Sequence, residues 1–250
     1  MSSIHIHEEH DRVLARIDRP ETRNALDRDV VRDLHAMCDA LESSPRILIL
    51  SGAQTETSAV FASGEDIREL NERRGADALD GVNSSLFDRI SRLPMPVIAA
   101  VDGFALGGGA ELALAADFRI ATPRARFGTP ETGLGIMAAA GGTWRLRNLV
   151  GDAVAAEMLL AGRILSAREA LELHLVTEIH EPDELLTAAA RLADRIAAQD
   201  PVAVRVTKLV MKMPRSAHPI VDDIAQAVLF DSPGKQERMT AFLNRQQDSR

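Results

Sequence analysis

Hydrophobic positions follow two different patterns along the chain. In the first 125 residues, short apolar runs rich in branched side chains alternate with helical stretches. The runs are 4–7, 13–17, 47–51, 97–101 and 118–121, and the spacing of 27–42 predicts an amphipathic helix. Strands that alternate with helices are typical of an α/β protein.

Strand patterns nearly disappear after about residue 140. Helical spacing takes over, and prolines lie near the starts of several segments. These predicted helices are 152–161, 166–173, 183–199, 201–212, 217–230 and 234–247.

Two glycine-containing segments lead into predicted helices. The first runs from the apolar strand 97–101, through Gly107, Gly108 and Gly109, into the helix formers of 110–116. Glycine lets a ligand approach the backbone, and the N–H groups of a first helical turn attract negative charge. The second is 61–70, which contains Gly64. Converging N–H groups would form an oxyanion hole, in which one donor is typically worth about 3 kcal/mol.

Two glutamates accompany these segments. Glu111 lies on the first turn of an alanine- and leucine-rich helix, and Glu131 follows Pro130 in a loop. Taken singly, each has an ordinary explanation: Glu111 would interact with the helix dipole, and Glu131 would be a solvated surface carboxylate. Together they suggest an acid/base pair.

Composition narrows the class of protein. With 46% hydrophobic residues, 26% charged residues and a net charge of -8, the chain is typical of a globular protein, and nucleic acid is not an expected partner. The single cysteine, Cys38, excludes a disulfide within the chain and favours a reducing compartment. We expect no membrane span, no signal peptide and a cytoplasmic location, since no uncharged apolar run approaches about 18 residues. We find no metal-ligand pattern.

The chain resembles the crotonase (enoyl-CoA hydratase/isomerase) superfamily, and within it the enoyl-CoA hydratases. The resemblance rests on segments 19–26, 61–67, 96–117, 127–135 and 140–146, with later agreement at 161–170 and 239–243. It implies a crotonase-type spiral of strand-strand-helix turns in a core, 1–190, that holds the active site. It also implies a helical region, 191–250, that assembles the protein into a homotrimer or a dimer of trimers.

The resemblance makes Glu111 and Glu131 the catalytic pair, with Glu131 exchanging the C2 proton and Glu111 activating water. It places the N–H groups of Gly108 and Glu65 in the oxyanion hole and uses the N–H of Ala139 to hold the attacking water. A carboxylate aimed inward at position 65 would repel the developing enolate, so we expect this side chain to point outward.

The same resemblance implies a coenzyme A site, and coenzyme A belongs to the substrate, so no separate cofactor is expected. Arg23 would lie beside the nucleotide, where its fixed charge suits a phosphate, although a surface ion pair is the alternative. Arg245 matches a lysine position near the nucleotide of a neighbouring subunit. The other residues of the implied site are Asn24, Ala25, Leu26, Ala62, Ser63, Gly64, Asp66, Ile67 and Gly107.

The favoured function is therefore an enoyl-CoA hydratase, which adds water reversibly to a 2-enoyl-CoA in fatty acid or related acyl-CoA metabolism. Two alternatives remain open. One is an enoyl-CoA isomerase that uses mainly Glu131. The other is a non-catalytic acyl-CoA-binding homologue, suggested by Glu65 and by Ala138 and Ala139, which stand where many relatives have a Pro-Gly step.

Overall fold

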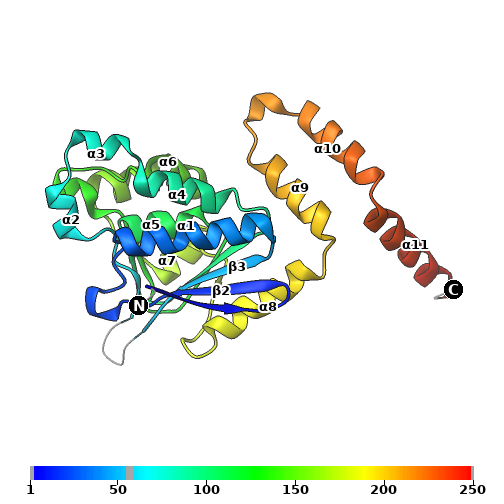
Figure 1. The fold of residues 1–250 in the computed structure, drawn as a ribbon, viewed down its shortest axis with the longest axis horizontal. Coiled ribbons are helices and arrows are strands. Elements are labelled where there is room, and N and C mark those ends of the chain that lie inside the picture. Colours follow the sequence, from blue (N-terminus) through cyan, green and yellow to red (C-terminus); the bar gives the residue numbers. More distant parts are fainter. Residues whose placement is uncertain (1–2, 55–58, 249–250) are drawn as a thin grey trace.

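The computed structural model describes residues 3–54 and 59–248, which fold around two β-sheets (Figure 1). The larger sheet has the strand order β1-β2-β3-β5-β7-β10, and the smaller has the order β4-β6-β8-β9. Strands β1 with β2 and β8 with β9 are antiparallel, and the remaining pairs are parallel. The larger sheet contains β1 (Ile4–Glu8), β2 (Arg12–Ile17), β3 (Ile47–Gly52), β5 (Val97–Val101), β7 (Phe118–Ala121) and β10 (Glu178–Ile179). The smaller sheet contains β4 (Val60–Ala62), β6 (Phe104–Leu106), β8 (Arg126–Gly128) and β9 (Leu165–Ser166).

The chain visits the two sheets in turn, and helices follow each visit. Strands β3 and β4 precede α2 (Ile67–Glu72), α3 (Gly75–Leu79) and α4 (Val82–Ser91). Strands β5 and β6 precede α5 (Gly108–Ala115), while β7 and β8 precede η2 (Pro130–Leu134) and α6 (Gly142–Ala161). This order confirms the predicted α/β fold built from strand-strand-helix turns.

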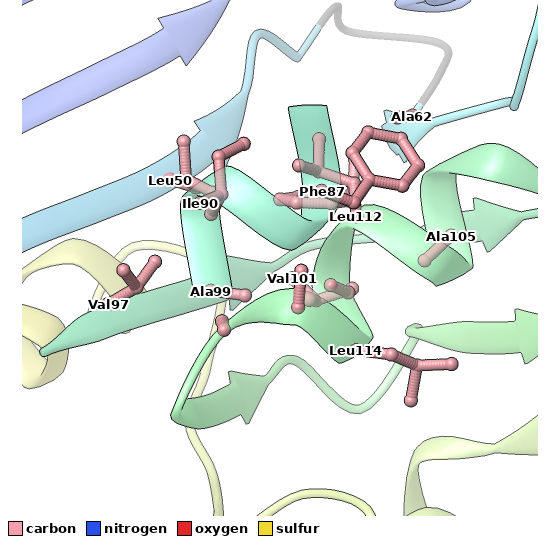
Figure 2. Close-up of a cluster of buried hydrophobic side chains, with 14 of the residues drawn as sticks. Leu50, Ala62, Phe87, Ile90, Val97, Ala99, Val101, Ala105, Leu112 and Leu114 are labelled. Carbon is pink, nitrogen blue, oxygen red and sulfur yellow. The ribbon is translucent and has the colours of Figure 1, made fainter. Parts of the chain in front are cut away.

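One face of the larger sheet packs against helices α4, α5 and α1 (Arg28–Ser43). Figure 2 shows Leu50 and Val101 of the strands in the same cluster as Phe87 and Ile90 of α4 and Leu112 of α5. All five side chains are fully buried. Helix α1 adds its apolar side to this cluster.

The opposite face of the sheet is buried too. Ile49 and Ile98 alternate with the residues of the first cluster, so their side chains point the other way and pack with Leu192 and Ile196 of α8 (Leu185–Ala197). Burial on both faces explains why β3 and β5 are continuously apolar and readable from the sequence.

Helix α8 spans the expected boundary at residue 190 and packs against β3, β5 and β7. The chain leaves the core after this helix, through α9 (Pro201–Met211), η3 (Arg215–Ala217), α10 (Ile220–Phe230) and α11 (Pro233–Asp248) (Figure 1). Helix α9 is tied to the core by Lys208, whose Nζ lies 2.6 Å from Asp117 Oδ2 and donates to the carbonyl of Met95 at 2.8 Å. Among the described residues, no helix is long and apolar enough to cross a membrane.

The predicted elements correspond closely to the observed ones. The five predicted strands are β1, β2, β3, β5 and β7, and the predicted C-terminal helices are represented by part of α6 and by α7 (Ala167–Glu172) to α11. The helix predicted at 27–42 is α1, which begins where the Asp27 side chain accepts the N–H groups of Asp29 and Val30. The sequence analysis missed β4, β6, β8, β9 and β10, of two or three residues each.

Candidate active site

Three adjacent parallel strands bring the site residues together. Strands β4, β6 and β8 are neighbours in the smaller sheet, and each is followed directly by a segment that the sequence analysis singled out. Because the carboxyl ends of parallel strands meet at one edge of a sheet, Gly64, Gly107 and Glu131 are neighbours there. The fold therefore assembles the candidate site from segments that are far apart in the chain.

Glycines allow the first turn of α5 to pack in direct contact with the backbone of β4. Gly107 has a φ of 53°, and its N–H donates to the carbonyl of Gly128 at 2.9 Å. A Cβ on Gly109 would lie 2.1 Å from the carbonyl oxygen of Ala62, so a larger residue would push the helix away from the strand. The close contact fixes where the first turn of α5 presents its N–H groups.

The two expected oxyanion-hole donors are adjacent. A Cβ on Gly64, which has a φ of 99°, would lie 3.3 Å from the nitrogen of Gly108. A Cβ on Gly108 would lie 3.6 Å from the nitrogen of Glu65. The backbones of Gly108 and Glu65 thus run side by side, as a two-donor site for a developing oxyanion requires.

Glu111 is buried and held by two backbone groups. Its Oε1 accepts hydrogen bonds from the N–H groups of Ala140 and Gly142, each at 2.8 Å. Burial raises the pKa of Glu111 to about 7, and the negative charges of Glu131 and Glu65 act in the same direction, while the two N–H groups oppose them. A carboxyl with this pKa can both accept and donate a proton near neutrality.

Glu131 is buried without such support. Neither carboxylate oxygen has a hydrogen-bond partner among the residues that the structure describes. Its Oε1 would lie 3.2 Å from a Cβ on Gly107, which places the carboxylate beside the start of α5. Burial raises the pKa of Glu131, and the charge of Glu65 raises it further.

The loop before α6 supplies residues that the sequence analysis did not assign. Ala139, expected to contribute its N–H, is exposed, and the donors to Glu111 are those of Ala140 and Gly142. Buried Arg145 donates from Nη1 to the carbonyl of Ala140 at 3.0 Å and so braces this loop from behind. The glycines in the run Ala140-Gly141-Gly142 were the sequence signal for a close backbone approach in this loop. In the structure a Cβ on Gly142 would lie 3.0 Å from Glu111 Oε1.

The Glu65 side chain, which we expected to point outward, is bound by two other side chains. It is only 18% exposed, and its Oε2 lies 2.9 Å from Nη1 of Arg73, which follows α2. Its Oε1 accepts a short hydrogen bond from Nδ2 of Asn83 on α4. The sequence analysis connected neither Arg73 nor Asn83 with the site.

The segment expected beside the coenzyme A nucleotide docks against the segment that follows β4. The N–H of Leu26 donates to the carbonyl of Gly64 at 2.8 Å, and the N–H of Ser63 donates to the carbonyl of Arg23 at 3.2 Å. The side chain of Asn24 is fully buried, and its amide donates to the carbonyls of Ala53 at 3.0 Å and Val60 at 2.6 Å. Asn24 therefore shapes the loop.

The remaining expected ligand residues fall into two groups. Ala25, Leu26 and Ala62 are buried, so their side chains are not available to a ligand. Arg23 and Ile67 are exposed. Asp66 accepts the N–H groups of Arg68 and Glu69 and thereby caps α2.

Arg245 is not brought to this site within one chain. It lies in α11, which Figure 1 shows well away from the core.

A cavity lies away from these residues. A volume of about 650 Å³ separates α9 from residues 92–94 of the core. Glu65, Glu111 and Glu131 do not line this cavity. The candidate active site is therefore defined by the carboxylates and the backbone N–H donors. The lining residues are Arg92, Leu93, Pro94, Val202, Arg205, Val206, Lys208, Leu209, Lys212, Met213 and Pro214.

Known proteins share both the sequence and the fold. Residues 11–249 match the family described as enoyl-CoA hydratase/isomerase. The chain is 36% identical to a short-chain-enoyl-CoA hydratase of Clostridium acetobutylicum, over 92% of this chain and 90% of that protein. It is 35% identical to a crotonyl-CoA hydratase of Syntrophomonas wolfei, with the same coverage. The crystal structure of an enoyl-CoA hydratase from Bacillus anthracis superposes with a TM-score of 0.90 at 30% identity, covering 97% of this chain and 96% of that one. The chain therefore belongs to the enoyl-CoA hydratase/isomerase family.

Proposed function

We propose that the protein is an enoyl-CoA hydratase that converts a 2-enoyl-CoA reversibly to the 3-hydroxyacyl-CoA. One observation carries the proposal: two buried carboxylates with raised pKa, Glu111 and Glu131, accompany the adjacent N–H groups of Gly108 and Glu65. A proton-transfer pair beside an oxyanion hole is what addition of water to a conjugated thioester requires.

The backbone donors would act on the thioester oxygen. When the water oxygen bonds to C3, the electron pair of the C2–C3 double bond moves toward the carbonyl, and negative charge develops on the oxygen. The N–H groups of Gly108 and Glu65 would stabilise that charge more strongly than the neutral carbonyl of the substrate.

The two glutamates would divide the proton movements. Both backbone hydrogen bonds of Glu111 end on Oε1, so Oε2 remains available to orient a water molecule and take its proton. Glu131 would deliver a proton to C2 and complete the addition, and the reverse reaction would remove it again. The carboxylate of Glu131 is suited to this role because no other described residue forms a hydrogen bond with its oxygens and competes for its proton.

The length of the acyl chain and the contact with coenzyme A can be proposed from different features. The names of the relatives from Clostridium acetobutylicum and Syntrophomonas wolfei favour a short acyl chain such as crotonyl. Exposed Arg23, on the loop that docks beside Gly64, would meet a phosphate of coenzyme A. Coenzyme A enters and leaves as part of the substrate, and we propose a cytoplasmic site of action.

The test is to incubate the purified protein with crotonyl-CoA and, separately, with a 3-enoyl-CoA. Loss of the conjugated-enoyl absorbance from crotonyl-CoA with a gain of one water in product mass would support the hydratase. Migration of the double bond in the 3-enoyl-CoA without hydration would support the isomerase alternative. Binding without turnover of either thioester would support a non-catalytic acyl-CoA-binding protein.

A further inference from the structure

The negative charge of the Glu65 carboxylate beside the oxyanion hole has to be compensated by a positive charge. The Glu65 N–H lies beside that of Gly108, and a Cβ on Gly108 would lie 3.5 Å from Glu65 Cγ. The side chain therefore starts at the hole, and an unpaired negative charge there would oppose the charge that develops on the thioester oxygen. Some feature of the protein has to offset it.

Arg73 is the cation in position to do so. Its Nη1 lies 2.9 Å from Glu65 Oε2, and the two side chains are 21% and 18% exposed. A pair that is largely shielded from water interacts more strongly than a surface pair. Nη2 of Arg73 also lies 3.9 Å from Oε2 of Glu69, which is in α2.

Asn83 fixes the other carboxylate oxygen. An ionised carboxylate only accepts hydrogen bonds, so the Asn83 amide has to turn its Nδ2 toward Glu65 Oε1. Its own Oδ1 is then left buried without a partner in the described part of the chain. A buried unsatisfied acceptor is costly, so the contact with Glu65 is favoured over full satisfaction of the amide.

The peptide of Glu65 is held from the other side by the loop before α1. The N–H of Leu26 bonds to the carbonyl of Gly64, and Leu26 and Glu65 form a parallel bridge. Backbone contacts thus fix the peptide while Arg73 and Asn83 fix the side chain. Together they determine where the Glu65 N–H points.

We propose that Arg73 is a positioning residue of the oxyanion hole, which neutralises and orients the Glu65 carboxylate so that the Glu65 N–H can serve as a donor. The inference takes its ligand, an acyl-CoA thioester, from the proposed function. It predicts that Arg73 affects the polarisation of the bound thioester carbonyl without touching it.

The test compares Arg73→Met, Arg73→Lys, Glu65→Gln and the double variant Glu65→Gln with Arg73→Met. The matched control is Arg68→Met, an exposed arginine of α2, the helix that Arg73 follows. Butyryl-CoA, isotopically labelled at its thioester carbonyl, is unreactive toward hydration, and its carbonyl stretching frequency in the infrared reports the hole directly. Crotonyl-CoA turnover supplies kcat and KM, and circular dichroism checks the fold.

We expect Arg73→Met to move the carbonyl frequency back toward that of free butyryl-CoA and to lower kcat roughly tenfold or more, with a smaller change in KM. Arg73→Lys should keep most of the polarisation because it keeps the charge. The double variant should recover to within a few-fold of Glu65→Gln, since no carboxylate remains to be compensated. Arg68→Met should behave as wild type.

An unchanged carbonyl frequency in Arg73→Met, or a double variant as impaired as Arg73→Met, would overturn the inference. An Arg73→Met chain that does not fold leaves Arg73→Lys to decide, and loss of polarisation in a folded Arg73→Lys would likewise contradict charge compensation. Absence of hydration by the wild type would refute the proposed function alone, because the infrared measurement needs binding but no turnover.

Discussion

The two buried glutamates of the candidate active site, Glu111 and Glu131, differ in the hydrogen bonds that their carboxylates accept. Glu111 Oε1 is held by the N–H groups of Ala140 and Gly142, whereas the oxygens of Glu131 have no hydrogen-bond partner among the described residues. The first arrangement suits a carboxylate that holds water in a fixed place. The second suits one whose proton moves.

Replacement of Glu131 by Gln tests the second role. The amide keeps the shape of the side chain but cannot transfer a proton, so kcat for crotonyl-CoA should fall by about 10²- to 10⁴-fold. The dissociation constant of butyryl-CoA, measured by calorimetry, should change little. A folded variant that turns over at the wild-type rate would remove Glu131 from the mechanism.

Replacement of Glu111 by Gln tests the burial of the first carboxylate through stability. The pKa of about 7 in the folded state lies above the ordinary value of 4.5, so the folded protein retains a proton that the unfolded chain has lost. Stability from this group therefore falls as pH rises from about 4.5 to about 7 and stays lower above that range.

The Gln variant lacks this titration. The free energy of unfolding of the variant minus that of the wild type should therefore increase by up to about 3 kcal/mol as the pH rises from about 4.5 to about 8. Denaturant unfolding of both proteins at several pH values measures the difference. A difference that is independent of pH would show that Glu111 does not titrate with a raised pKa in the folded protein.

The roles that could be inferred from sequence were those carried by local motifs. Glu111 and Glu131 each stand in a recognisable segment with glycines nearby. Glu65 is bound by Arg73, which follows α2, and by Asn83 of α4, and both contact its side chain only after folding. No periodicity or spacing relates such residues to one another, so their contribution required coordinates.

At the scale of secondary-structure elements, the loop before α6 and Gly142, the first residue of that helix, determine the position of Glu111. Their N–H groups point at the carboxylate, and a Cβ on Gly142 would lie 2.8 Å from the Cβ of Ala138 and 3.0 Å from Glu111 Oε1. This glycine is required by contact with neighbours across the site.

Gly142→Ala should therefore displace Glu111 and lower kcat by roughly tenfold to a hundredfold, although every N–H donor remains. The matched control is Gly133→Ala in η2, where a Cβ would meet no atom within 4 Å. Steady-state kinetics of the two variants make the comparison. Equal rates for Gly142→Ala and Gly133→Ala would show that the loop does not hold Glu111 in place.

Element length explains which strands were predictable. Strands β3 and β5 have five or six buried residues and stand out as apolar runs, because both of their faces are covered. Strands β4, β6 and β8 have three residues each and are ordered mainly by pairing with one another. Three residues are too few for a periodic pattern, although these strands carry the site.

At the scale of the whole molecule, the C-terminal helices lack a partner that would cover them. Helix α10 has no buried residue in the single chain, and Figure 1 shows α10 and α11 extending away from the core. Exposed apolar side chains line both helices. They include Ile220, Ile224, Val228, Phe230, Met239, Phe242 and Leu243.

We predict that these helices assemble the protein into a trimer or a dimer of trimers, since many large apolar side chains exposed on adjoining helices usually mark an interface. Aspartates at Ile224 and Val228, one turn apart on α10, should reduce the molar mass measured by light scattering. Gln226→Asp, on the opposite side of the same helix, is the control for charge. A wild-type protein that remains monomeric at micromolar concentration would contradict the prediction.

The central claim is that Glu131 and Glu111 add water to an enoyl thioester, and isotope incorporation tests it most directly. Wild-type protein and Glu131→Gln are each incubated with crotonyl-CoA in water enriched in heavy oxygen, and the product is analysed by mass spectrometry. The wild type should yield 3-hydroxybutyryl-CoA carrying heavy oxygen at C3, and the variant should yield almost none. Absence of 3-hydroxybutyryl-CoA from the wild-type reaction, or equal labelling of this product by both proteins at the same early time, would contradict the account.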